Sequence, residues 1–268
     1  MRILFLGDVV GQTGCSAIKK NLHNIIKEEN IDFTIVNGEN AADEGVGITQ
    51  NIFEEFLSCG VDVVTSGNHI WDQKETLQFI KNQSRLLRPI NMDNKLPGNG
   101  FTILKARTGL RIGVLNLMGN VFMKKCDDLF MNLNNFLENN SLKQDYDCLV
   151  VDVHGEITSE KMAVGHFLDG KATLVVGTHT HVPTNDARIL SKGTGYMTDA
   201  GMCGDYDSVI GMDKSNSIQK FLKKESIKHF PSKGEATLSG VIVDVNNQTG
   251  LAQKIKSFIT GGVLNNTK

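Results

Sequence analysis

Two histidines lie one residue apart, directly after an apolar stretch, in the second half of the 268-residue sequence. The stretch reads "LVVGTHTH", and its histidines are His179 and His181. Because alternate residues of an extended segment point to the same side, both imidazoles could face one site. Neutral imidazole is a common metal ligand, so the pair indicates a metal site. Two histidines cannot complete such a site, and the other ligands must come from elsewhere in the chain.

Nitrogen and oxygen donors also follow four other apolar stretches of the sequence. A glycine precedes the first polar residue in three of them, which lets the chain turn sharply beside a bound ion. Because the carboxyl ends of parallel strands meet at one edge of a sheet, these donors are expected to converge. They are Asp8 after "ILFLG", Glu39 and Asn40 after "TIVNG", Asn68 and His69 after "VVTSG", and His154 after "LVVDV".

Each of these residues, taken alone, also has a simpler interpretation. Asp8 could cap the helix that follows it. Asn40 and Asn68 are typical turn residues, and a single histidine such as His154 often serves only the structure. Donors at five separate strand ends are harder to explain by capping alone, which favours the metal site.

The number of donors predicts two metal ions. Seven candidate ligands exceed the four that a tetrahedral zinc site uses. Two ions about 3.5–4 Å apart, sharing Glu39 as a bridge, would use all of them and could turn a shared water into a hydroxide nucleophile. His69 could then protonate the leaving oxygen as a general acid, with Asp72 holding its ring. The candidate metal ligands are Asp8, Glu39, Asn40, Asn68, His154, His179 and His181.

The first third of the chain alternates between strand and helix patterns. Apolar runs at 2–8, 33–40 and 61–69 are typical of buried strands. The segments between them, "CSAIKKNLHNIIKEEN" and "TQNIFEEFLSCG", have apolar residues at helical spacing. This order predicts a parallel sheet with crossover helices.

The later part of the chain predicts a mixed or antiparallel sheet. The segment between residues 101–106 and 110–117 is too short to hold a helix, so the two runs are expected to form a hairpin. We therefore expect two sheets packed together, with helices outside, in one domain over residues 1–268. Residues 203–236 are expected to form a peripheral helical or cap element. The remaining strands are expected at 147–156, 172–181, 193–201, 238–246 and 254–259, with a helix at 158–168.

Composition excludes several classes of protein. The net charge is −2 with both signs mixed along the chain, which gives no case for nucleic-acid binding or for a membrane-surface protein. No apolar run approaches the roughly 20 residues that span a bilayer. Five widely spaced cysteines without a C-x-x-C motif argue against a disulfide framework. We expect a cytoplasmic protein without a membrane segment, for which a homo-oligomer is compatible with the sequence.

In these motifs the chain resembles the calcineurin-like binuclear metallophosphoesterases. Their signature runs D-x-H, G-D-x-x, G-N-H-[DE], H and G-H-x-H. The corresponding stretches are "GDVVG", "NGEN", "GNHIWD", "DVHGE" and "GTHTH", in the same order. The chain departs from the signature at Val10, which replaces a histidine ligand, at Glu39, which replaces the bridging aspartate, and at Ile70. In these departures, and in the stretches "LLRPIN", "TDAGMCG" and "LSGVIVD", the chain resembles one bacterial branch of the superfamily. That branch consists of 2',3'-cyclic-nucleotide phosphodiesterases with a two-iron centre.

The resemblance implies a fold, a ligand arrangement and a substrate class. It implies an α/β fold, a four-layer α/β/β/α sandwich with two mixed sheets. It implies two divalent or trivalent metal ions, iron by resemblance, with manganese and zinc as alternatives. It also implies a small phosphate ester, a cyclic nucleotide, as the substrate. One ion would be held by Asp8, Glu39, Asn40 and His181, and the other by Glu39, Asn68, His154 and His179, with His69 as proton donor and Asn40 replacing the histidine missing at Val10.

Other interpretations stay open at this point. A regulatory protein that binds a metal or a nucleotide, with weak incidental turnover, would use the same ligands. A metal-dependent amidohydrolase is less consistent, because its histidine pair belongs on the first strand. Arg88 in "LLRPIN" could contact a substrate phosphate, although a structural role is favoured for it and for Asp199.

Overall fold

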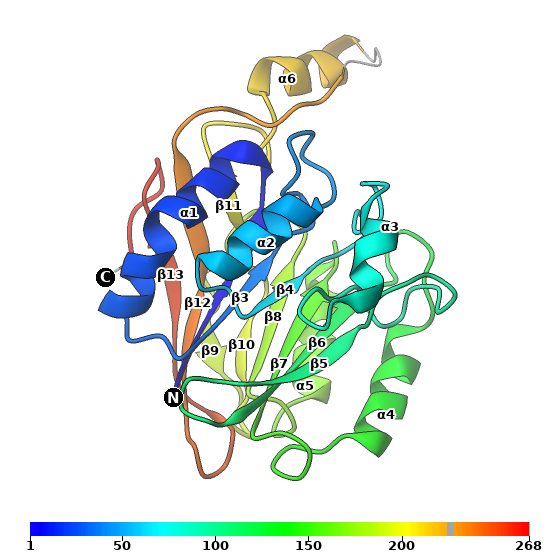
Figure 1. The fold of residues 1–268 in the computed structure, drawn as a ribbon, viewed down its shortest axis with the longest axis vertical. Helices are drawn as coiled ribbons and strands as arrows, with labels where there is room; N and C mark the ends of the chain where they lie inside the picture. The colour runs from blue at the N-terminus through cyan, green and yellow to red at the C-terminus, as the bar shows by residue number, and fades with distance from the viewer. Residues whose placement is uncertain (224–227, 268) are drawn as a thin grey trace.

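In the computed structural model, which describes residues 1–223 and 228–267, two mixed β-sheets pack face to face with helices outside them (Figure 1). The first sheet has the strand order β2-β11-β12-β1-β3-β4, with β13 on the other side of β12. Strands β1, β3 and β4 are parallel, as the sequence predicts. The strands are β1 (Arg2–Leu6), β2 (Asp8–Val9), β3 (Phe33–Asn37), β4 (Val63–Thr65), β11 (Met202–Asp205), β12 (Ala236–Val245) and β13 (Ala252–Thr260).

The second sheet has the order β5-β6-β7-β8-β10-β9. Strands β6, β7, β8 and β10 are parallel, and β5 and β9 are antiparallel edge strands. The β5–β6 pair is the hairpin that the sequence predicts. Its strands are β5 (Phe101–Lys105), β6 (Arg111–Met118), β7 (Cys148–His154), β8 (Leu174–Thr178), β9 (Arg188–Ile189) and β10 (Gly195–Met197).

Helices cover the outer face of each sheet. Helices α1 (Gly11–Glu28) and α2 (Gln50–Ser58) share a buried apolar cluster with the outward side chains of β1, β3 and β4. Helices α4 (Leu129–Asn139) and α5 (Thr158–Phe167) do the same for β6, β7 and β8. These clusters and the core between the sheets form the α/β/β/α layers, so the predicted fold class is confirmed.

The core between the sheets depends on the alternation of side chains along each strand. Ile3 and Phe5 of β1 and Cys148 and Val150 of β7 all point into this core. The side chains between them belong to the outer clusters. Because the period of a strand is two residues, the inner side of β7 continues after Val150 to polar side chains at the carboxyl end of the strand. The side chains between the two sheets are therefore apolar in the core and polar at the carboxyl ends of the strands.

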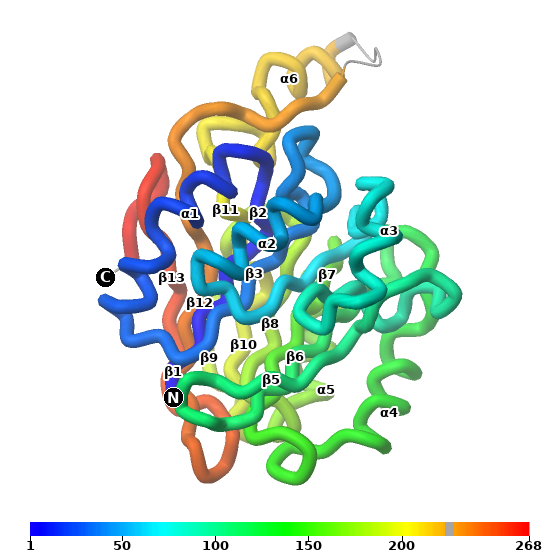
Figure 2. The backbone as a smooth tube through the Cα atoms, in the orientation of Figure 1, coloured from blue at the N-terminus to red at the C-terminus, as the bar shows by residue number. Residues whose placement is uncertain are grey.

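Strands that are far apart in sequence lie side by side in the first sheet. Strand β12 pairs antiparallel with β1, and Leu4 is opposite Ile242. Figure 2 shows the two segments running together, with β13 on the other side of β12. The final part of the chain thus completes the sheet that the N-terminus begins.

Some elements differ from the sequence-based expectations. Helix α4 and strand β11 were not expected, and the predicted strand 193–201 is limited to β10, followed by β11. Within the predicted cap segment 203–236, α6 (Lys214–Lys223) lies apart from the sheets at the top of Figure 1. Residues 224–227 of that segment are outside the described residues. A short helix, α3 (Thr76–Phe79), and a 3-10 helix, Ile80–Asn82, precede β5. Among the described residues, no helix has both the length and the apolar composition needed to cross a membrane.

Candidate metal centre

All seven predicted ligands come together where strands of both sheets end. Asp8 begins β2, and His154 is the last residue of β7. The other five follow β3, β4 and β8. Contacts between these side chains divide them into two neighbouring groups, one around His154 and the other around His181.

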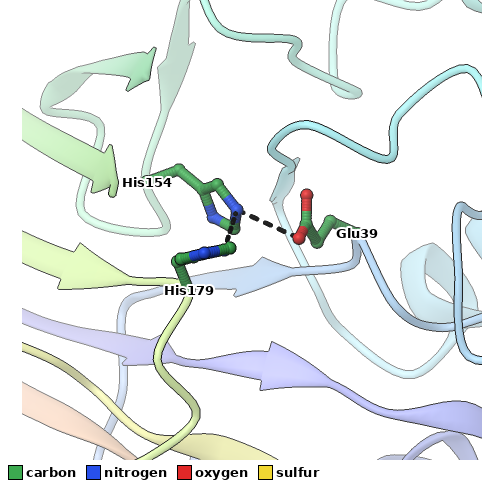
Figure 3. A group of neighbouring side chains, drawn as sticks. All are labelled: Glu39, His154 and His179. Carbon is green, nitrogen blue, oxygen red and sulfur yellow. Dashed lines mark hydrogen bonds and ion pairs between the residues drawn. The ribbon is translucent and has the colours of Figure 1, made fainter. Parts of the chain in front are cut away.

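The first group converges on the Nε2 atom of His154. This nitrogen lies 3.0 Å from Glu39 Oε1, 3.2 Å from Asn68 Oδ1 and 3.1 Å from His179 Nδ1. Figure 3 shows Glu39 and the two imidazoles pointing toward one another from three different segments. One ligand atom from each of Glu39, His154 and His179 lies within 4.8 Å of the others, close enough to bind one ion.

The second group lies around the Nε2 atom of His181. This nitrogen is 3.2 Å from Asn40 Oδ1 and 3.9 Å from Asp8 Oδ1. The same Asp8 oxygen is 3.8 Å from His154 Nδ1, which connects the two groups. Asp8 Oδ1 is buried and has no hydrogen-bond partner among the described residues. Buried carboxylate oxygens are nearly always satisfied, so this orphaned atom fits a site for a cation.

A polar group lies on the far side of each imidazole, as a hydrogen-bond partner for His154 and His181 and as a carboxylate contact for His179. His154 Nδ1 lies 2.9 Å from Thr178 Oγ1, His181 Nδ1 lies 2.8 Å from the carbonyl oxygen of Ile210, and His179 Nε2 lies 3.2 Å from Glu156 Oε2. When these nitrogens donate, the opposite nitrogen of each ring keeps its lone pair for the site. This arrangement is typical of metal-binding histidines.

The hydroxyl of Thr178 is itself oriented by a buried carboxylate. It donates to Asp152 Oδ1 at 2.7 Å, so its lone pair is free to accept from His154. The other oxygen of Asp152 accepts from Thr65 Oγ1 at 2.5 Å and from Asn37 Nδ2 at 2.9 Å. Burial raises the pKa of Asp152 to about 7, although its hydroxyl donors and nearby His154 oppose this effect.

The amide of Asn40 is oriented in a similar way. Its Nδ2 donates to the carbonyl oxygen of Gly45 at 2.8 Å, which turns Oδ1 toward His181. Asn40 is therefore able to supply an oxygen ligand in place of the histidine that the resemblance expects at Val10.

The charges within the site are strongly coupled. Burial lowers the pKa of His154, but the negative charges of Glu39 and Asp8 outweigh burial and raise it to about 9. Burial raises the pKa of Glu39, yet the positive charge and hydrogen bond of His154 hold it below its usual value. Burial and repulsion from His154 lower the pKa of His179 to about 3. A proton on His154 balances the carboxylates of the metal-free site, and a cation would replace it.

A glycine allows these ligands to approach the backbone closely. A Cβ atom at Gly67 would overlap both the imidazole of His154 and Glu39 Oε2. The site therefore requires glycine directly before Asn68.

The two histidines of the H-x-H pair lie beyond the strand, not within it. Strand β8 ends at Thr178, and His179 and His181 have φ angles of 98° and 65°. The expectation of an extended segment is therefore wrong. Such conformations cost a non-glycine residue about 1–3 kcal/mol. They direct His179 toward His154, and His181 toward Asn40.

His69 lies beside the site at partial exposure. Its backbone N–H donates to Glu39 Oε2 at 3.1 Å, and its Nδ1 is 2.6 Å from Asp72 Oδ2. Because Asp72 engages Nδ1, Nε2 is left to exchange a proton with a bound molecule. Lys124 lies close by and donates to the carbonyl oxygen of Asn68 at 2.7 Å.

Comparison with known proteins gives a family for this chain. The family described as YmdB-like protein matches residues 4–258. The chain belongs to the YmdB-like family. This YmdB-like chain is 42% identical over 259 residues, 97% of each chain, to the 2',3'-cyclic-nucleotide 2'-phosphodiesterase of Bacillus subtilis strain 168.

Two crystal structures are similar to this YmdB-like protein over nearly the whole chain. A hypothetical protein from Thermus thermophilus superposes with a TM-score of 0.90 at 37% identity, covering 98% of this chain and 100% of the other. A phosphatase from Mycoplasma pneumoniae superposes with a TM-score of 0.89 at 36% identity, covering 97% and 93%. The resemblance stated from the motifs is thus confirmed.

Several residues around the centre of this YmdB-like protein were missed from the sequence. Asp152 alternates with His154 along β7, and Glu156 follows in the same "DVHGE" motif, which is a signal that could have indicated both. Thr178 lies within "GTHTH", although nothing in the sequence shows that its hydroxyl bonds His154.

Arg88, for which the sequence favours a structural role, is buried. Its guanidinium donates to backbone carbonyls, those of Pro89, Ile90, Met92 and Gly98.

Proposed function

We propose that this protein is a metal-dependent phosphodiesterase that hydrolyses small phosphate esters, with 2',3'-cyclic nucleotides as its substrate class. The observation that carries this proposal is the convergence of seven nitrogen and oxygen donors in two adjoining groups beside the orphaned oxygen of Asp8. The activity named for the Bacillus subtilis relative supports the substrate class.

The two groups would each hold one ion, with Glu39 between them. Nitrogen and oxygen ligands of this kind suit iron, manganese and zinc, and we propose iron from the family resemblance. Two bound ions supply charge neutralisation for a phosphate and lower the pKa of a water molecule. The ligands would be Asp8, Glu39, Asn40 and His181 for one ion, and Glu39, Asn68, His154 and His179 for the other.

The chain itself supplies the proton for the leaving group. When a 2',3'-cyclic phosphate opens, one ribose oxygen leaves phosphorus and must gain a proton. His69 would donate it from Nε2, because Asp72 holds Nδ1 at 2.6 Å and fixes the ring. A positioned general acid of this kind contributes about 10²–10⁴-fold to the rate.

One lysine, Lys124, lies beside the proposed acid and could meet the phosphate of a substrate. The ammonium of Lys124 lies 3.7 Å from Asp72 Oδ1, next to the proposed acid. Its side chain is half-exposed, so it can also meet the phosphate of a bound ester.

The test combines metal analysis with a substrate panel. Purified protein is analysed for bound metal, reconstituted with Fe, Mn or Zn, and assayed on 2',3'-cAMP, 3',5'-cAMP, a phosphomonoester and bis-p-nitrophenyl phosphate. Preference for 2',3'-cAMP is expected, with loss of turnover in Asp8→Ala and His69→Ala. His23→Ala, at an exposed position on α1, is the matched histidine control.

Two outcomes would contradict this proposal. Unchanged hydrolysis by Asp8→Ala and His69→Ala would exclude the assigned roles. Tight binding of a nucleotide without turnover in any of the three metals would instead favour a regulatory binding protein.

A further inference from the structure

A buried ion pair lies next to the H-x-H segment. Lys161 of α5 is only 1% exposed, and its ammonium is 2.7 Å from Asp199 Oδ2. Asp199 follows β10 and is also 1% exposed. Burying two charges is costly unless they are paired and hydrogen-bonded. Such a pair is stable only when further hydrogen bonds satisfy its charged groups, and the bonds of Asp199 show what the pair holds in place.

The carboxylate of Asp199 bonds the residue between the two histidines. Its Oδ2 accepts from the backbone N–H of Thr180 at 3.2 Å and from the hydroxyl of Thr180 at 2.8 Å. Its Oδ1 accepts from the backbone N–H of Gly201 at 2.9 Å. One buried side chain thus fastens the centre of the H-x-H segment to the chain beyond β10.

The segment needs such a fastening because its backbone is strained. Both His179 and His181 have positive φ angles, which residues other than glycine adopt only when surrounding contacts enforce them. Thr180 lies between them, so its bonds to Asp199 fix the peptide that joins His179 to Thr180 and the side chain directly before His181.

The lysine also connects this segment to the strand that carries His154. Helix α5 begins four residues after β7 ends, and the turn between them contains Glu156, whose carboxylate is 3.2 Å from His179 Nε2. Gly177 makes room for the lysine stem, because a Cβ atom there would lie 2.6 Å from Lys161 Cδ. His179 is therefore held at its ring by Glu156 and at its backbone neighbour by Asp199.

We propose that Asp199 and Lys161 are positioning residues that hold His179 and His181 in the geometry for binding two metal ions. The carboxylate supplies the acceptor for Thr180, and the lysine pairs with that carboxylate and orients it inside the protein. This inference rests on the proposed function, because it assigns the pair to the same metal centre.

The main test variants remove the acceptor without leaving an unpaired buried charge. Lys161→Met with Asp199→Ala deletes the acceptor, whereas Lys161→Met with Asp199→Asn keeps an oxygen that Thr180 can bond. Asp186→Asn is the matched control. Its carboxylate accepts four bonds in the loop that follows the histidines, from Thr184, Arg188 and twice from Thr198, and has none to residues 179–181.

Two measurements distinguish positioning from general stability. Calorimetric titration with Mn²⁺ should show metal affinity about 10–100-fold weaker in the Asp199→Ala double variant, as for residues that orient metal ligands. The Asp199→Asn double variant should return to within a few-fold of the parent, and Asp186→Asn should bind as the parent does. In metal-free protein, hydrogen exchange over residues 177–182 should be faster only in the Asp199→Ala double variant.

The possible failures can be told apart. If the parent binds none of Mn, Fe and Zn, the proposed function fails and this inference fails with it; a parent that binds only Fe or Zn is titrated, with its variants, using that metal. If the parent binds Mn²⁺ and the Asp199→Ala double variant, still folded, binds it equally well, only the positioning role is overturned. If the double variant does not fold, Thr180→Val tests the same hydrogen bond by itself, and affinity equal to the parent together with unchanged exchange would overturn the role.

Discussion

Replacement of Gly67 by alanine would place a methyl group between two of the proposed metal ligands. The new Cβ atom would overlap the ring of His154 and Glu39 Oε2. Carbon contacts normally lie at about 3.5–4.0 Å, so both side chains must move, each by about 1 Å or more. Overpacking of this kind costs about 1–3 kcal/mol of stability. A displacement of about 1 Å costs roughly 10²-fold in rate when it affects reacting groups.

The assay for Gly67→Ala measures unfolding, metal affinity and hydrolysis on the same preparation. We expect a folded protein with Mn²⁺ affinity and 2',3'-cAMP hydrolysis both lowered by about 10²-fold. Gly155→Ala is the control, because it directly follows His154 and a Cβ atom there meets nothing closer than 3.5 Å. If Gly67→Ala bound metal and turned over substrate as well as Gly155→Ala, His154 and Glu39 could not be ligands in the arrangement described.

Three further predictions concern the residues around the centre. Asp72→Asn should lower kcat less than His69→Ala does, and both variants should keep the metal content of the parent. Steady-state kinetics and metal analysis check these two expectations. Because the negative charges around His154 raise its pKa from 6.5 to about 9, metal-free protein gains stability from its proton below about pH 6.5 and loses that gain as the pH rises through about 9. A metal must displace this proton, so the affinity for Mn²⁺ should rise between pH 7 and 9. Calorimetry in buffers of different ionisation enthalpy should show the released proton. An affinity that does not change with pH would contradict this prediction. Thr178→Val should leave His154 Nδ1 and Asp152 Oδ1 without a hydrogen-bond partner. Urea titrations should therefore show a free energy of unfolding lower by about 1–3 kcal/mol. Metal affinity should fall by about 10-fold or more.

The sequence predicts the strands and the place of the site because both depend on local patterns. Apolar runs that end in polar residues mark the carboxyl ends of β1, β3, β4, β7 and β8. Within each sheet the ends of the parallel strands lie along one edge, and the packing of the two sheets against each other brings the ends of β1, β3 and β4 to those of β7 and β8. The list of candidate ligands follows from that rule together with the chemistry of each side chain.

The contacts that orient the ligands depend on tertiary structure and were not predictable. Lys161 lies on α5, where a lysine is normally solvent-exposed, and only the fold brings it to Asp199, 38 residues away. The left-handed conformation of His179 was missed because an H-x-H sequence after a strand indicates a continued strand. Helix α4, "LFMNLNNFLEN", was missed because its asparagines are weak helix formers, while its packing against the second sheet stabilises it.

The most direct test of the central claim is the location of bound metal. Crystals of the protein grown with Mn²⁺ would be measured at a wavelength that gives an anomalous signal from manganese. We predict two peaks about 3.5–4 Å apart, bridged by Glu39, with His179 at the ion held by Asn68 and His154, and His181 at the ion held by Asp8 and Asn40. A single peak bound by both His179 and His181, or no peak near Glu39, would contradict the account.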